Sequence, residues 1–104
     1  MAYEIEFAPA AKRAFKKLAN EARAHMAPVI EALATTPRPK AAVKLGDIEG
    51  YGCYRVRSGS YRVIYVVLED TLLILVTQVG HPKEVYRRFE EAARRAIKDR
   101  SLRK

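Results

Sequence analysis

Two different spacings of hydrophobic residues divide the chain. Residues 3–7 alternate apolar and polar side chains, which is typical of a half-buried β-strand. Residues 9–33 then carry apolar side chains at helical spacing, interrupted by Pro28, with Asn20 as the expected cap of a second helix. The run Thr36-Pro37-Arg38-Pro39 ends this part. The N-terminal third is therefore predicted to form one strand and a pair of helices.

The second half of the chain changes to strand spacing. Residues 53–57 and 61–68 are rich in Tyr, Val and Ile and flank Ser58-Gly59-Ser60, a pattern typical of a β-hairpin. Residues 72–79 are almost continuously apolar, which predicts a central strand buried on both faces. Helical spacing returns over residues 83–98. The order β-α-α-β-β-β-α predicts an α+β fold, namely a small, mostly antiparallel four-stranded sheet with the helical pair on one face and a C-terminal helix.

The composition is that of one globular domain spanning residues 1–104. Hydrophobic residues make up 49% of the chain and charged residues 31%, which is enough for a core without covalent staples. The single cysteine, Cys53, excludes an internal disulfide and is expected to act as a small buried side chain. No apolar run approaches the ~18 residues that cross a bilayer, and the N-terminus lacks a signal-peptide pattern. We therefore expect a cytoplasmic protein with no membrane partner.

Positive charge is concentrated in the second half of the sequence. The chain has a net charge of +8, and residues 53–104 carry twelve basic against six acidic side chains. Nine of those twelve basic residues are arginine, whose planar guanidinium suits phosphate. Such a distribution favours a polyanionic partner, although charge alone fits a well-solvated surface equally well.

The predicted hairpin gathers arginines on one face of the sheet. A two-residue loop pairs Arg57 with Arg62, and cross-strand partners point the same way, so both share a face with Arg55. Like charges opposite each other destabilise paired strands, and a bound phosphate would offset that cost. The alternative is that each arginine extends into water or pairs with an acid such as Glu69 or Glu84.

A second candidate lies directly after the buried strand, in Gly80-His81-Pro82-Lys83-Glu84-Val85-Tyr86. His81 can exchange a proton near neutral pH, Lys83 adds a donor, and Tyr86 offers a flat ring. The alternative interpretation is a connecting loop whose histidine has only a structural role.

Together these segments resemble the RelE/ParE toxin superfamily, and its RelE branch in particular. The likeness rests on Gly52-Cys53-Tyr54-Arg55-Val56-Arg57, Tyr61-Arg62-Val63-Ile64-Tyr65 and Val79-Gly80-His81-Pro82-Lys83-Glu84-Val85-Tyr86, and it spans nearly the whole chain. It implies a toxin of a type II toxin-antitoxin system: a ribosome-dependent endoribonuclease that cuts mRNA in the ribosomal A site and is held inactive by a cognate antitoxin. The alternatives are a ParE-like toxin that inhibits DNA gyrase and a non-toxic nucleic-acid-binding module.

The resemblance also implies which residues act. It places the catalytic set at Arg55, Arg57, Arg62, His81 and Tyr86, with no metal or cofactor. In RNA cleavage through the 2′-OH, the arginines would stabilise the phosphorane, His81 would protonate the departing 5′-oxygen, and Tyr86 would stack on a base. Some members of the superfamily have lysines where Arg55 and Arg57 stand, which leaves open the group that activates the 2′-OH. Further RNA contacts with mRNA or rRNA are expected from Tyr61, Lys83, Arg87 and Arg88.

Overall fold

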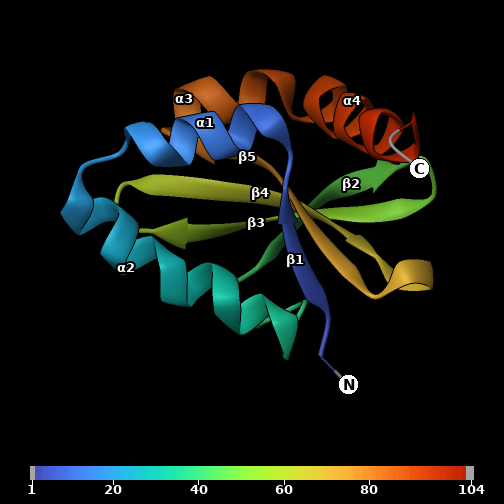
Figure 1. Ribbon diagram of the computed structural model, residues 1–104, viewed down its shortest axis with the longest axis horizontal. Coiled ribbons are helices and arrows are strands. Elements are labelled where there is room, and N and C mark those ends of the chain that lie inside the picture. Colours follow the sequence, from blue (N-terminus) through green and yellow to red (C-terminus); the bar gives the residue numbers. More distant parts are fainter. Residues whose placement is uncertain (1, 103–104) are drawn as a thin grey trace.

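A mixed five-stranded sheet runs through the middle of the molecule, as the computed structural model of the chain shows for residues 2–102 (Figure 1). The strand order is β1-β5-β4-β3-β2, with β1 parallel to β5 and the other neighbours antiparallel. The strands are β1 (Glu4–Phe7), β2 (Val43–Ile48), β3 (Tyr51–Ser58), β4 (Tyr61–Leu68) and β5 (Leu73–Gly80). The helices are α1 (Pro9–Lys17), α2 (Asn20–Glu31), α3 (Pro82–Val85) and α4 (Phe89–Leu102). The α+β class is thus confirmed.

The sheet separates two apolar clusters because successive strand side chains point to opposite faces. The helical pair α1 and α2 covers one face, as predicted, and the cluster beneath it includes Met26, Ile30, Tyr54, Tyr65 and Val76. The C-terminal helices cover the other face over a cluster that includes Cys53, Ile64, Val66, Leu75 and Ala93. Strand β5 is buried on both faces, which confirms its predicted central position.

The predicted count of four strands is wrong, because β2 forms a fifth strand at the edge of the sheet. Its pairing with β3 shifts register between Lys44 and Gly46, so a bulge interrupts the apolar alternation that Val43 and Leu45 begin. A search for alternating apolar and polar residues therefore misses this strand. A bulged edge strand also offers a poorer template for pairing with another chain.

The helix boundaries differ from prediction in two places. Ala19, not Asn20, is the N-cap of α2. The Asn20 side chain instead contacts the guanidinium of Arg23, which also donates to the Lys16 and Leu18 carbonyls at 2.7 and 2.6 Å and so satisfies the end of α1. The C-terminal helical region is not continuous, since a 3₁₀ turn at Tyr86–Arg88 separates α3 from α4.

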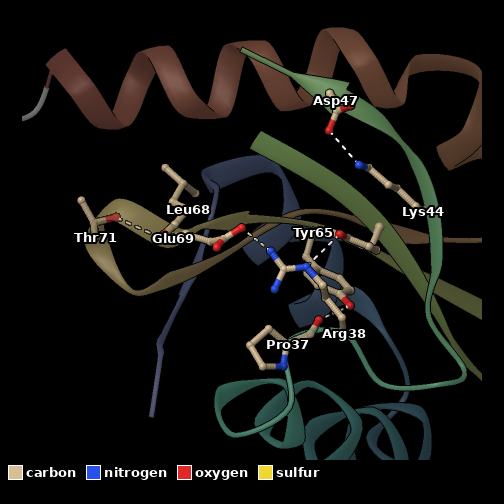
Figure 2. A network of polar contacts seen from close by, with 9 residues as sticks. Pro37, Arg38, Lys44, Asp47, Tyr65, Leu68, Glu69 and Thr71 are labelled. Atoms are coloured by element: carbon tan, nitrogen blue, oxygen red, sulfur yellow. Dashed lines mark hydrogen bonds and ion pairs between the residues drawn. The ribbon is translucent and has the colours of Figure 1, made fainter. Parts of the chain in front are cut away.

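A polar network fixes the segment after α2 to the sheet (Figure 2). The Tyr65 hydroxyl donates to the Pro37 carbonyl at 2.7 Å, and Arg38 Nε donates to the Tyr54 hydroxyl at 2.9 Å. Burial raises the pKa of Tyr65, so its hydroxyl remains protonated and keeps this donor role. Arg38 also forms an ion pair with Glu69. Glu69 is therefore engaged by Arg38 of the segment after α2.

Cys53 is fully buried on the α4 side of the sheet, as the sequence predicted. Burial, with a smaller effect from Glu90, raises the pKa of its thiol from 9.0 to about 12. The folded chain holds this proton more tightly than the unfolded chain, so the stabilisation is complete below pH 9 and is lost as the pH rises toward 12.

We therefore expect the Cys53 thiol of the native protein to resist a disulfide reagent at neutral pH and to react only on unfolding. Cys53→Ala should reduce the alkaline loss of stability measured by urea unfolding across a pH series. Reaction of the native thiol at the rate of free cysteine would contradict this prediction.

Candidate active site

The β3–β4 hairpin has the register that the sequence predicted. Ser58 pairs with Tyr61 across a loop of Gly59 and Ser60, and Arg57 pairs with Arg62. Gly59 has a φ of 61°, in the left-handed region that glycine adopts without strain, so it fixes the tight loop. A slip of one residue would have mixed arginine with valine on both faces of the hairpin.

This register collects three guanidinium groups on one face of the sheet, which we call the arginine face. Arg57 lies opposite Arg62, and Arg62 in turn lies opposite Gly80 of β5. Arg55 points to the same side from two residues earlier on β3. Arg57 is exposed, whereas Arg55 and Arg62 are half-buried against the sheet. All three therefore reach solvent from rigid strands.

In the part of the chain that the structure describes, no carboxylate pairs with the arginine face. Within residues 2–102, none of its three arginines forms an ion pair, and the only contact of the Arg62 guanidinium with a hydrogen-bond acceptor there is with the Tyr61 carbonyl at 3.1 Å. The two acids proposed as partners are engaged elsewhere: Glu69 with Arg38, and Glu84 with the His81 backbone N–H at 3.3 Å. Pairing with Glu69 or Glu84 was thus the wrong alternative.

His81 lies at the end of the central strand and immediately before α3. Its ring packs on Tyr61, with centroids 4.7 Å apart. Tyr61 packs on the apolar cluster beneath α1 and α2, so the two side chains lie at the edge of the sheet face that does not carry the arginines. Glycine at position 80 lets α3 pack closely against the end of β5, because a Cβ there would lie only 3.2 Å from Val85 Cγ1. His81 is exposed and is joined to the arginine row through Gly80.

The remaining predicted site residues surround this end of the sheet. Tyr86 is half-buried and packs on the cluster beneath α3 and α4, on the side of the arginine face. Lys83, Arg87 and Arg88 are exposed on α3 and the 3₁₀ turn that follows it. Sequence reasoning assigned Tyr61 to RNA and missed its contact with His81. These two residues are far apart in the sequence, and no spacing pattern signals their contact.

Among residues 2–102, no three His, Cys, Asp or Glu side chains gather closely enough to hold a metal ion. No helix in the same range is long and apolar enough to span a membrane.

The fold and the site define a small basic α+β protein: a mixed sheet has helices on both faces, and a row of arginines has no ion pair among residues 2–102. The family model for the ParE toxin of type II toxin-antitoxin systems matches residues 5–86, and the chain belongs to this family. The RelE/ParE superfamily predicted from the sequence is therefore confirmed.

Individual relatives place the chain beside RelE proteins. It is 27% identical to the mRNA interferase toxin RelE of Escherichia coli over 93% of its own length and 100% of that protein. The intact E. coli RelBE toxin-antitoxin complex contains a chain that matches with a TM-score of 0.67 and 27% identity, over 77% of this chain and 96% of that one. The archaeal RelE–RelB complex from Pyrococcus horikoshii matches in fold with a TM-score of 0.71 and 23% identity, over 81% and 99% of the two chains.

Proposed function

We propose that this chain is the toxin of a type II toxin-antitoxin system and acts as a ribosome-dependent endoribonuclease that cuts mRNA in the ribosomal A site. The observation that supports the proposal is the row Arg57–Arg62–Gly80, in which arginines without an ion pair among residues 2–102 lie in register with the residue that precedes His81. A binding module needs only positive charge. Fixed cations and a histidine at the same end of the sheet are the kinds of group that phosphodiester cleavage requires.

The roles of the arginines follow from where charge develops. Attack of the RNA 2′-OH on the adjacent phosphorus forms a phosphorane that carries additional negative charge. Arg55, Arg57 and Arg62 project from strands, so they can donate to that charge without reorganising as it appears. This mechanism uses the RNA's own hydroxyl as nucleophile and needs no metal ion.

The leaving group requires a proton on its 5′-oxygen. His81 is the imidazole at this end of the sheet and can serve as a proton donor, and its packing on the Tyr61 ring limits its motion. Tyr86 offers an aromatic face to a base, and Lys83, Arg87 and Arg88 add cations that the RNA backbone would meet. A guanidinium is a poor base, so activation of the 2′-OH by the ribosome or the RNA itself fits this site better than activation by Arg55 or Arg57.

The test is induction of the protein in cells, followed by mapping of mRNA 5′ ends and a parallel DNA gyrase assay. We expect codon-linked breaks within translated mRNA and unchanged supercoiling by gyrase. Gyrase inhibition without mRNA breaks would replace the proposal with the ParE-like alternative.

An antitoxin is the expected protein partner. The relative in the E. coli complex is bound to RelB, and the unpaired arginine face here presents charge that acidic segments would neutralise. Co-expression of the cognate antitoxin should relieve growth arrest by the toxin, and it should protect mRNA on ribosomes in vitro.

Ribosome binding should depend strongly on salt. Contacts from arginine and lysine to phosphate release counterions, so about five such contacts should lower the affinity by orders of magnitude between 50 and 200 mM salt, as a rough expectation. Pelleting of the toxin with ribosomes over a salt series measures this. A flat response would exclude the basic surface as the docking surface.

A further inference from the structure

A pocket of 540 Å³ separates the start of α1 from α4, away from the row that joins the arginine face to His81. We call it the α1–α4 pocket. It is lined by Arg13 of α1, by Arg88 and Arg95, and by Gln78 of β5. The side chains come from elements far apart in the sequence, and Figure 1 shows α1 and α4 lying along the same edge of the molecule. Its volume is in the range of pockets that hold small ligands.

The three arginines of this pocket have no ion-pair partner among the residues that the structure describes. Within residues 2–102, Arg13, Arg88 and Arg95 form no ion pair, although Glu91 and Asp99 also line the pocket. Three exposed guanidinium groups that converge without a carboxylate partner provide bidentate donors suited to phosphate.

Gln78 supplies a second, independent observation. Its Oε1 atom is buried and has no hydrogen-bond partner in the described part of the chain. A buried acceptor left unpaired is costly, so a ligand that brings a donor would relieve that cost. Gln78 lies in register with Ile64 and Arg55, which places its side chain on the same face of the sheet as the catalytic arginines proposed above.

We propose that the α1–α4 pocket binds a nucleotide of RNA outside the cleavage site, with phosphate on its arginines and a base N–H or ribose hydroxyl donating to Gln78 Oε1. One nucleotide carries both kinds of group. An acidic peptide satisfies the arginines too, but Glu91 and Asp99 are acceptors that the amino groups of a base can satisfy and that further carboxylates cannot. The choice of RNA as ligand rests on the proposed function.

The test is titration of the isotope-labelled, full-length protein with a mixed-sequence RNA pentanucleotide, followed by NMR. We expect the Gln78 side-chain amide and the Thr77 backbone signal to shift in a saturable way. Arg13→Ala/Arg95→Ala should weaken binding about tenfold and lower the slope of log affinity against log salt by about 1.4, since two phosphate contacts are lost. The matched control is Lys17→Ala/Lys98→Ala, which removes the same charge from the same two helices outside the pocket, and it should retain stronger binding than the arginine variant.

Equal weakening by both double variants, or the absence of shifts at Gln78 and Thr77, would overturn the assignment. Shifts of these signals with hexaglutamate but not with RNA would assign the pocket to an acidic protein segment and also overturn it. The NMR shifts report binding to the pocket and do not depend on mRNA cleavage. Saturable pocket shifts in a protein that cuts no mRNA would support this inference while the proposed function failed.

Discussion

Arg62→Ala is expected to abolish mRNA cleavage while the protein stays folded. Arg62 lies opposite Arg57 in the hairpin, so its removal relieves a like-charge contact and takes no side chain from either apolar cluster. The cleavage step loses a preorganised donor to the phosphorane, which in comparable sites costs roughly 3–4 kcal/mol, or a factor of about 10²–10³ in rate.

Single-turnover cleavage on programmed ribosomes measures the rate, and thermal unfolding checks the fold. Arg94→Ala is the matched control, because it removes one exposed arginine from α4 at the cost of a loose ion pair with Glu49 at 3.8 Å. Arg62→Lys keeps the charge but loses the planar fork, so an intermediate rate is expected. A melting temperature far below wild type would make Arg62 structural, and a rate within threefold of wild type would remove it from the site.

The strands that carry the candidate site were predictable because the turn residues and the apolar pattern of these segments determine their pairing without contacts from distant segments. The glycine-containing loop determines the hairpin register, and the register alone places Arg57 opposite Arg62. The continuous apolar run of β5 predicts a central strand, and its last residue, Gly80, pairs with Arg62, so His81 follows at the same end of the sheet.

The features that sequence reasoning missed depend on contacts between distant segments. β2 was missed because a bulge breaks its alternation, and only pairing with β3 makes it a strand. The residue type of Asn20 predicts a helix cap. In the structure its side chain instead accepts a hydrogen bond from Arg23, which also donates to a carbonyl at the end of α1. The contact of His81 with Tyr61, and the convergence of Arg13 with Arg95, join residues that no spacing rule relates.

Replacement of His81 by glutamine should slow cleavage by a factor of about 10²–10⁴ and leave ribosome binding nearly unchanged. His81 is exposed at the end of β5, and glutamine keeps a polar side chain of similar reach, so neither the core nor the charge of the docking surface changes. What is lost is the imidazole that acts as proton donor in the proposed mechanism. The pH dependence of the cleavage step should therefore flatten between about pH 6 and 8, whereas the affinity for ribosomes should not change.

His25→Gln is the control that isolates this effect. His25 is the other histidine of the chain, exposed on α2 with its Nδ1 3.2 Å from Ser58 Oγ, and its replacement should change neither the rate nor the pH profile. Tyr86→Phe should retain most of the activity that Tyr86→Ala loses if the ring stacks on a base, and both should lose it equally if the hydroxyl is required. Wild-type cleavage by His81→Gln in single-turnover assays would eliminate His81 as the acid and move that role to Lys83 or the arginine face.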